Sequence, residues 1–333
     1  MRRLILLAVL FCAGAWGRDW KKFPAVAQAD GASEIFAVGD AHGDVERLMR
    51  ALQAAGVIDT QSAWAAGQAV LVSTGDMIDK GPKGLDVIRF YSKLREGAAA
   101  KGGRVIVLAG NHEAEFLADP TISKAKDFVK ELNKAGIAVS DVTKCKGEIG
   151  EFLCTLAFAA RVNDVFFSHA GNSGGRSVAQ LESDIEKDFD QNGFAAKQLI
   201  GDGSVIEARL NGEGPGREPW IDAGLPGRQE KQLLQDYTKA LGVSRIVEGH
   251  VPGEVKFTDG TVRGRGEMFQ RFGMLYLIDT GMSRDVDESQ GALLRLTVGK
   301  EAQAAAICPD GKKTRLWDLA SGQDVGRAGA CSK

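Results

Sequence analysis

Short apolar runs of strand length alternate with amphipathic stretches along the first third of the chain. The runs occupy residues 34–39, 69–74 and 104–109. Between them, residues 44–56 and a stretch that opens at Pro82 repeat apolar residues every three or four positions, as one face of a helix does. The order strand, helix, strand, helix, strand predicts an α/β sheet.

The rest of the chain predicts elements of both kinds. Helical periodicity recurs at 120–136, 178–200 and 229–241, and apolar runs recur at 164–168, 245–248, 274–280 and 292–298. Residues 201–227 hold seven glycines and three prolines, a composition typical of a long loop at the rim of a site.

All four histidines stand at the end of an apolar run, beside Gly, Asn or Ser: His42, His112, His169 and His250. Asp76 also follows such a run directly. In open α/β sheets, ligands bind outside the carboxyl ends of the strands, which is where these residues fall. Imidazole, carboxylate and amide groups gathered there indicate a metal site, binuclear and hydrolytic.

The first two motifs illustrate how such a site is built. Asp40 and His42 are two residues apart, so in an extended segment both side chains point to one side and can hold one ion. Asp76 has enough lone pairs to bridge two ions. Taken alone, each motif also fits a turn with a capping aspartate, and each histidine also fits a core position. The joint occurrence of the motifs favours the metal site.

Asn111 and His112 are adjacent, so their side chains should diverge. We expect Asn111 to lie next to the substrate and to supply an amide oxygen to the metal. We expect His112 to act as an acid. Asp79, three residues after Asp76, is the candidate carboxylate that orients His112, raises its pKa and keeps it protonated. A local turn is the alternative interpretation of this motif.

The N-terminal residues predict an exported protein. Residues 1–17 combine two arginines with ten apolar residues, too few to span a bilayer, and end in small residues, so we expect a signal peptide cut after Gly17. A retained anchor helix is the alternative. We expect an irregular lead-in over 18–33, one domain over 34–299 and a packed C-terminal extension over 300–333. The protein would be periplasmic or secreted, without stable membrane insertion after cleavage.

The charge balance bears on the partners of the chain. Its 42 Lys and Arg against 44 Asp and Glu give a net charge of −2, and removing the two arginines of the signal gives 40 minus 44, or −4. A nearly balanced chain gives no reason to expect binding to nucleic acid or to an anionic membrane.

Four cysteines remain after removal of the signal: Cys145, Cys154, Cys308 and Cys331. An even number in an exported protein permits two disulfides. Three pairings are possible, and nearness in sequence favours Cys145–Cys154 and Cys308–Cys331. Buried free thiols are the alternative.

The motifs together resemble those of the calcineurin-like metallophosphoesterase superfamily. The order Gly-Asp-x-His-Gly, Gly-Asp-x-x-Asp-x-Gly, Gly-Asn-His-Glu, His-Ala-Gly and Gly-His is similar to the phosphoprotein phosphatase signature, and it extends from Ile35 to about Val298. Gly43-Asp44, Trp64 and the segment 246–250 resemble the Shewanella-like phosphatase branch in particular.

The resemblance implies a fold and a mechanism. The fold is a two-sheet β-sandwich flanked by helices, with a binuclear metal site at the strand ends. Two divalent ions are implied, manganese first, with iron or zinc as alternatives, and a water or hydroxide between them would attack phosphorus. His112, oriented by Asp79, would protonate the leaving oxygen. The implied ligands are Asp40, His42 and Asp76 for one ion, and Asp76, Asn111, His169 and His250 for the other.

One position departs from the pattern of the branch, which usually carries Arg after the second Asp. Here Lys80 stands in that place. An arginine grips phosphate through two parallel hydrogen bonds, whereas a lysine offers a point charge. We therefore expect Lys80 to contact the substrate and Arg209, in the Gly-rich segment, to compensate. A solvated loop arginine is the alternative for Arg209.

Three functions are compatible with the sequence. The first is hydrolysis of phosphomonoesters: phosphoserine, phosphothreonine, phosphotyrosine or small phosphate esters. The second is hydrolysis of phosphodiesters or dinucleoside polyphosphates, which the same centre could serve and for which Trp220 could stack on a base. The third is a binding protein that keeps the fold without catalysis, against which the intact set of candidate ligands speaks.

Overall fold

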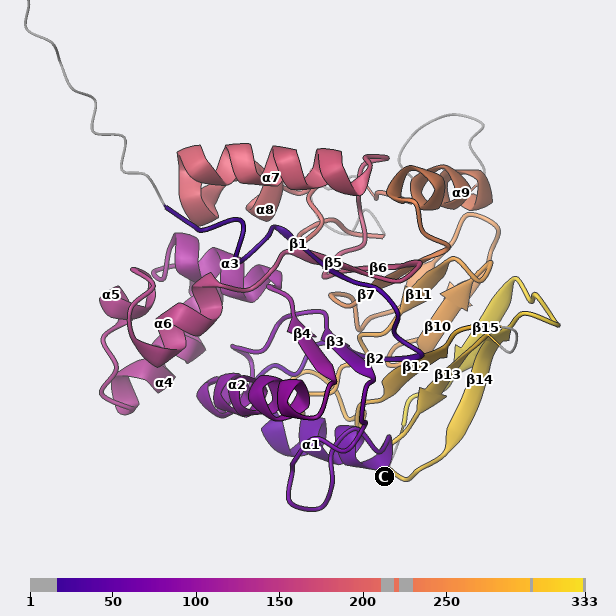
Figure 1. Cartoon of the computed structure of the whole chain (residues 1–333), viewed down its shortest axis with the longest axis horizontal. Helices are drawn as coiled ribbons and strands as arrows, with labels where there is room; N and C mark the ends of the chain where they lie inside the picture. Colours follow the sequence, from indigo (N-terminus) through magenta and orange to yellow (C-terminus); the bar gives the residue numbers. More distant parts are fainter. Residues whose placement is uncertain (1–16, 211–218, 222–229, 300–301, 332–333) are drawn as a thin grey trace, which may run out of the picture.

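The computed structural model describes residues 17–210, 219–221, 230–299 and 302–331. Two large sheets dominate it (Figure 1). The six-stranded sheet has the order β14 (Lys313–Asp318), β13 (Gln303–Ile307), β12 (Leu293–Thr297), β2 (Glu34–Val38), β3 (Val70–Ser73) and β4 (Arg104–Val107). The strands β2, β3 and β4 are parallel to one another.

The seven-stranded sheet has the order β1 (Val26–Ala29), β5 (Ala159–Val162), β6 (Val165–Ser168), β7 (Arg245–Glu248), β11 (Leu275–Leu277), β10 (Met268–Arg271) and β15 (Val325–Ala328). A short antiparallel pair, β8 (Val255–Lys256) and β9 (Val262–Arg263), follows β7 in the chain. The strands β6 and β7 are parallel.

Helices cover the outer faces of the sheets (Figure 1). Those on the side of β2 to β4 are α1 (Val45–Ala54), α2 (Gly84–Ala100), α3 (Asn111–Ala118), η1 (Ser123–Ala125), α4 (Lys126–Lys134), α5 (Val139–Val142) and α6 (Gly147–Cys154). Those that follow β6 in the chain are α7 (Val178–Asn192), η2 (Gly193–Ala195), α8 (Lys197–Ile200) and α9 (Glu230–Leu241).

Alternation along the strands explains why the sheets stack. On β2, Ile35 and Ala37 belong to the apolar cluster between the sheets, whereas Phe36 and Val38 belong to the cluster under the helices. Successive side chains of a strand point to opposite faces, so a strand that is apolar on both faces must be covered on both. The predicted α/β sandwich flanked by helices is confirmed.

Three local expectations need correction or comment. The lead-in is not irregular throughout, because Val26–Ala29 forms β1, parallel to β5. The helix expected over 178–200 is broken at Gly193, whose φ of 60° ends α7 in a conformation that suits glycine. The C-terminal segment adds strands β13 and β14 to one sheet and β15 to the other.

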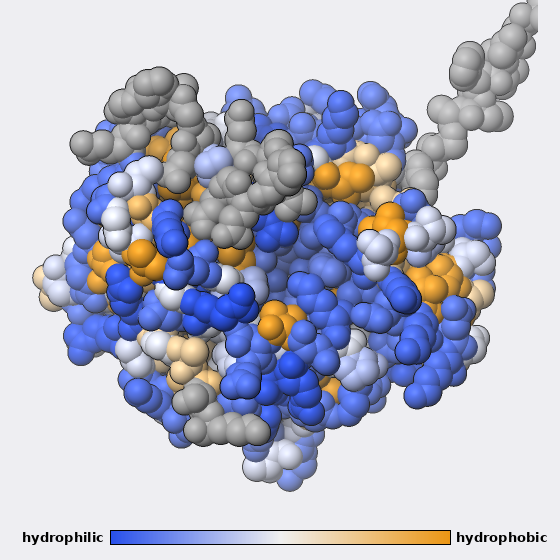
Figure 2. Space-filling view, turned by 180° about the vertical axis from the view of Figure 1, so that it is seen from behind, coloured by the Kyte–Doolittle hydropathy of each residue, from blue (hydrophilic) through white to orange (hydrophobic). Residues whose placement is uncertain are grey.

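Both expected disulfides form, Cys145–Cys154 and Cys308–Cys331. No helix in the described ranges is long and apolar enough to cross a membrane. The face opposite to that of Figure 1 is mainly hydrophilic, with hydrophobic residues in small groups (Figure 2).

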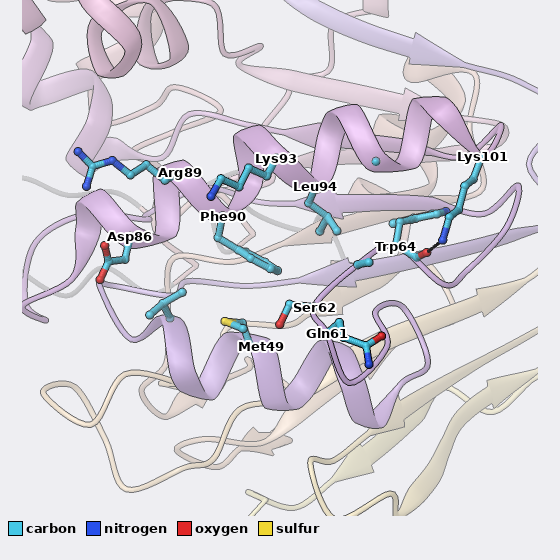
Figure 3. A pocket seen from close by; sticks show the side chains of 13 residues that line it. Met49, Gln61, Ser62, Trp64, Asp86, Arg89, Phe90, Lys93, Leu94 and Lys101 are labelled. Atoms are coloured by element: carbon cyan, nitrogen blue, oxygen red, sulfur yellow. Dashed lines mark hydrogen bonds between the residues drawn. The ribbon is translucent and has the colours of Figure 1, made fainter.

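A groove of about 650 Å³ lies between α1 and α2, with Met49 of α1 and Phe90 of α2 pointing into it (Figure 3). Its far end is closed by Trp64, whose carbonyl accepts a hydrogen bond from Lys101 at 2.6 Å. None of the predicted catalytic, metal-binding or substrate-binding residues lines this groove.

Candidate metal centre

The candidate ligands come from loops at the carboxyl ends of five strands. Asp40 and His42 follow β2, Asp76 follows β3, and Asn111 and His112 form the first turn of α3 after β4. From the other sheet, His169 follows β6 and His250 follows β7. Parallel strands bring their carboxyl ends to one edge, and the sandwich brings the edges of the two sheets together.

One group of side chains gathers around Asp76 and His42. The His42 Nε2 atom lies 3.5 Å from Asp76 Oδ2 and 3.9 Å from Asp40 Oδ2. His112 Nε2 lies 4.0 Å from Asp76 Oδ2. His42, Asp76 and His112 offer ligand atoms within 4.8 Å of one another. Asp40 and His112 thus both lie next to the pair formed by His42 and Asp76.

A second group shares Asp76 and is tighter. His169 Nε2 lies 3.4 Å from Asp76 Oδ2, 3.2 Å from Asn111 Oδ1 and 2.9 Å from His250 Nδ1. Four potential donor atoms thus converge on one point. Nitrogen and oxygen ligands in this number suit a divalent transition metal. His250 Nε2, across the ring from the Nδ1 atom that faces His169, is buried without a hydrogen bond to any described residue.

Backbone carbonyls fix the orientation of two rings. His42 Nδ1 bonds the Ile78 carbonyl at 3.0 Å, and His169 Nδ1 bonds the Thr74 carbonyl at 3.0 Å. Each bond occupies one ring nitrogen and leaves Nε2 directed at Asp76. Such partners on the far side of a ligating imidazole set its tautomer and its direction.

The loops adopt left-handed backbone at non-glycine residues, which costs roughly 1–3 kcal/mol each and clusters at functional sites. The φ values are 39° at His42, 51° at Asp76, 60° at Asp79, 61° at Lys80 and 68° at His250. The extended Asp40-Ala41-His42 segment expected from the spacing is wrong, because the chain turns at His42. The two side chains still face one region.

Charge is unevenly distributed across the centre. Burial acts most strongly and favours a lower pKa for His169, but Asp76 and then Asp40 together raise this pKa to about 10. Burial, opposed by Asp76 and assisted by Lys80, lowers the pKa of His42 to about 3. Burial, His169 and then Arg209 lower the pKa of His250 well below its ordinary value. Neutral imidazoles at His42 and His250 are the forms that bind cations.

His112 and Asp79 form a pair at the edge of the centre. His112 Nδ1 lies 3.1 Å from Asp79 Oδ2, and the other oxygen of Asp79 accepts the Phe128 N–H at 2.9 Å. Burial favours a lower pKa for His112, but Asp76 and the hydrogen bond to Asp79 together raise this pKa above its ordinary value. The second nitrogen of the ring points toward Asp76.

Comparison with known proteins agrees with this arrangement. A family model for calcineurin-like phosphoesterases matches residues 33–254. The chain belongs to this family. As a calcineurin-like phosphoesterase it is a hydrolase of phosphoester bonds, and its two overlapping groups of side chains are able to hold metal ions.

Three relatives show how far the similarity extends. An uncharacterized protein of Schizosaccharomyces pombe is 29% identical over 74% of this chain and 73% of its own. Shewanella-like protein phosphatase 1 of Plasmodium berghei is 31% identical, over 41% of this chain but only 39% of its own length. The crystal structure of a cold-active protein-tyrosine phosphatase of a psychrophilic Shewanella species covers 88% of this chain and 84% of its own, with 20% identity and a TM-score of 0.64. That likeness concerns the fold.

The two predicted substrate cations both lie by the centre of this phosphoesterase. The ammonium of Lys80, which is exposed, lies 3.0 Å from His42 Nε2. Arg209 is half-buried and close enough for its charge to act on His250. A groove of about 340 Å³ begins at Lys80 and runs along α4, past Lys130 and Lys134. Two larger cavities, of about 650 and 690 Å³, include none of the predicted site residues in their walls.

Glu113 was not predicted from the sequence, although its carboxylate joins the loop after β3 to the start of α3. Its carboxylate accepts the N–H groups of Gly110 at 2.8 Å, Asp76 at 2.9 Å, Met77 at 2.8 Å and Ile78 at 3.2 Å. Burial and then the charge of Asp76 raise its pKa to about 7. The available signal was its place as third residue of α3, where a glutamate often caps a helix.

Other missed residues are acidic and buried. Burial raises the pKa of Asp40 most strongly, and Asp279, which follows β11, raises it further. Glu248 ends β7, and burial raises its pKa well above the ordinary value. Glu207 comes from the Gly-rich segment and lies by Asn111. No spacing in the sequence distinguishes these three from surface acids.

Proposed function

We propose that this phosphoesterase hydrolyses phosphomonoesters with two divalent metal ions, manganese in the first place. The observation that carries the proposal is that Asp76 belongs to both groups, His42–Asp76–His112 and Asp76–His169–His250. Asp40 lies beside His42, and Asp79 holds His112. Asp40, His42 and Asp76 would hold one ion, and Asp76, Asn111, His169 and His250 the other. When bound, such ions polarise a phosphoryl oxygen and lower the pKa of water.

The side chains of the chain have separate tasks in this reaction. His112 holds a proton on Nε2 and delivers it to the oxygen of the leaving group, while Asp79 fixes the ring through Nδ1. Lys80 and Arg209 place positive charge where the phosphate oxygens of the substrate would lie. The left-handed loops keep these groups in place before the substrate arrives.

Phosphorylated proteins or peptides, and small phosphate esters, are the proposed substrates. The named activities of the Plasmodium and Shewanella relatives support a phosphoprotein. Dinucleoside polyphosphates fit less well, because Trp220 is only 3% exposed and stacks on Tyr237 with 5.7 Å between ring centroids. The expectation that Trp220 is available for a base is therefore wrong for this conformation.

We also propose export to the periplasm or the cell exterior. Disulfides persist mainly in oxidising compartments, and two of them support this location. The predicted signal, residues 1–17, lies outside the described residues except at its end. Fractionation of cells that express the full chain, followed by N-terminal sequencing of the product, tests the proposal.

Metal-dependent hydrolysis by residues 18–333 tests the activity. The protein is stripped with a chelator, restored with Mn²⁺, Fe²⁺ or Zn²⁺, and assayed on p-nitrophenyl phosphate and bis-p-nitrophenyl phosphate. Turnover of the monoester alone supports the proposal and leads to a panel of phosphopeptides. Preference for the diester would overturn it in favour of a phosphodiesterase. Bound metal without either activity would favour a binding protein.

A further inference from the structure

The groove between α1 and α2 has an apolar floor, and the proposed reaction gives it no task. Met49, Phe90 and Leu94 point into it, and Trp64 closes its far end (Figure 3). Its volume of about 650 Å³ lies within the range of about 300–1,000 Å³ typical of ligand-binding clefts. Met49 and Phe90 are only half-buried, so a partner that covered them would remove apolar surface from water.

Positive charge predominates among the side chains that line the groove. The cations are Arg89, Lys93 and Lys101, and Asp86 is the only acid among the described lining residues. Lys93 is exposed and makes no ion pair or hydrogen bond within the described part of the chain. Arg89 lies 4.0 Å from Glu148, but the two side chains stay 43% and 63% exposed, so this pair is weak. Lys101 donates to a backbone carbonyl, which leaves its charge uncompensated.

The cations are spread along the groove instead of being gathered at one end. A helix rises about 1.5 Å per residue, so Lys93 lies about 6 Å beyond Arg89 along α2, and Lys101 about 12 Å beyond Lys93. Asp86 and Lys101, at the two ends, are therefore about 22 Å apart along the helix axis. An extended peptide of roughly 6–7 residues spans this distance at about 3.3 Å per residue.

An extended acidic segment fits the groove in both charge and spacing. Alternate side chains of an extended chain share one face and lie about 6.6 Å apart, close to the rise from Arg89 to Lys93. Acidic residues on that face would meet the basic side chains of α2, while the apolar residues of the other face would pack into the groove. An amphiphile with a single anionic head, such as a fatty acid, would match only one position along this row of cations.

One end of the groove lies beside the candidate metal centre. The N–H of Lys83, the residue before α2, donates to the carbonyl of Gly43 at 3.2 Å, directly after His42. Val45 and Asp86, which follow these two residues closely in the chain, line this end of the groove. We propose that the groove is a docking site for an extended acidic segment of a partner protein, with apolar residues between its acids. The docking site is distinct from the metal ligands, so binding there does not depend on hydrolysis.

Fluorescence anisotropy of a labelled heptapeptide, Asp-Leu-Asp-Phe-Asp-Leu-Asp, titrated with the protein tests the proposal. A peptide of the same composition with its charges in one block, Asp-Asp-Asp-Asp-Leu-Phe-Leu, is the control. The alternating peptide should bind saturably below about 1 mM, and at least about fivefold more tightly than the block peptide. Raising the salt concentration tenfold should weaken its binding, because exposed charges are then screened.

Variants of the groove locate the binding. Lys93→Glu should weaken binding of the alternating peptide at least about fivefold, because an attraction becomes a repulsion. Lys130→Glu, the same charge reversal at an exposed lysine of α4 outside the groove, should change it less than about twofold. Phe90→Ala should weaken it about fivefold or more, whereas Leu319→Ala, at a leucine that is 60% exposed after β14, should not. Thermal unfolding checks that each variant is folded.

Three outcomes would overturn the docking site. They are no binding of the alternating peptide up to about 1 mM, binding no tighter than that of the block peptide, and equal losses in Lys93→Glu and Lys130→Glu. Calorimetric binding of dodecanoate without binding of the peptide would assign the groove to a single-headed amphiphile instead. Turnover of p-nitrophenyl phosphate should be the same in Lys93→Glu and wild type, so these results leave the proposed hydrolysis to be judged separately.

Discussion

His112 Nδ1 lies 3.1 Å from Asp79 Oδ2, while Asp79 Oδ1 accepts the Phe128 N–H at 2.9 Å. The aspartate is thus held by the backbone at the start of α4 and in turn holds the imidazole. Both side chains are almost completely buried. A histidine fixed in this way presents one nitrogen, Nε2, to the space beside Asp76 and can give up a proton there.

The leaving group decides how much His112 matters. An alkoxide leaves poorly without a proton, whereas p-nitrophenolate leaves readily. We expect His112→Asn to lower kcat about 10²- to 10⁴-fold on an alkyl phosphate and much less on p-nitrophenyl phosphate. Steady-state kinetics on both substrates at saturating Mn²⁺ measure the difference. Equal losses would show that His112 supports the metal centre rather than the leaving group.

The dependence of kcat on pH tests how Asp79 acts on His112. The pKa of His112 is raised despite burial, through Asp76 and the bond to Asp79. A raised pKa keeps the acid protonated to higher pH, so kcat on an alkyl phosphate should be constant below it and fall as pH rises through it. In Asp79→Asn this alkaline limb should move to lower pH, by about one unit or more. A limb that does not move would assign it to another group.

Much of the centre could be predicted because its residues follow buried strands. The strands β2, β3 and β4 are apolar on both faces, which gives continuous runs, and each ends directly before a polar motif. The joint position of four histidines then implies one site without any contact being known. The ring directions were not predictable, because the Ile78 and Thr74 carbonyls lie in the loop after β3, distant in sequence from His169 and from His42.

The missed features depend on contacts between distant residues. β1 is a four-residue edge strand, half-exposed at its end, and it has no long apolar run to reveal it. Glu113 is an ordinary acid in sequence, and its importance comes from the backbone N–H groups that fold around its carboxylate. Alternation of apolar residues carries no information on such pairings.

Lys80 should control the binding of phosphate. Its ammonium lies at the centre, 3.0 Å from His42 Nε2. We expect Lys80→Ala to weaken competitive inhibition by inorganic phosphate about tenfold or more, because a charged hydrogen bond is lost. Lys80→Arg should tighten it, since a guanidinium can bind two phosphate oxygens at once. Inhibition constants measured with p-nitrophenyl phosphate test both changes.

Lys134 provides a matched control for Lys80. It lines the same groove, and its side chain makes no ion pair or hydrogen bond among the described residues, so Lys134→Ala should leave phosphate inhibition within about twofold. If Lys80→Ala has no larger effect than Lys134→Ala, Lys80 does not contact the phosphoryl group.

Gly249 should tolerate no side chain, because the candidate metal ligand Asp40 lies against its backbone. A Cβ atom at this position would lie 2.4 Å from Asp40 Oδ1 and 2.6 Å from Thr74 Oγ1. Gly249→Ala must push Asp40 away from His42, and we expect turnover to fall about 100-fold or more. Gly253 is four residues further along and has nothing within 4 Å of such an atom, so Gly253→Ala should keep wild-type activity. Mn²⁺ affinity and kcat of both variants decide the matter.

The disulfide Cys308–Cys331 should stabilise the sandwich without affecting the metal centre. Cys308 follows β13 of the six-stranded sheet and Cys331 follows β15 of the seven-stranded sheet, so the bridge joins the two layers across 23 residues. Replacing both cysteines by serine should lower the free energy of unfolding by about 2–4 kcal/mol.

The disulfide Cys145–Cys154 spans only 9 residues. Its removal should lower the free energy of unfolding less than removal of Cys308–Cys331, by a difference of up to about 1 kcal/mol, since a shorter loop restricts the unfolded chain less. Urea unfolding of both double variants, with and without a reductant, measures these losses. A wild-type protein whose unfolding midpoint is unchanged by the reductant would mean that the bridges do not stabilise it, whereas equal Mn²⁺ affinity in all forms is the expected sign that the centre is built independently of them.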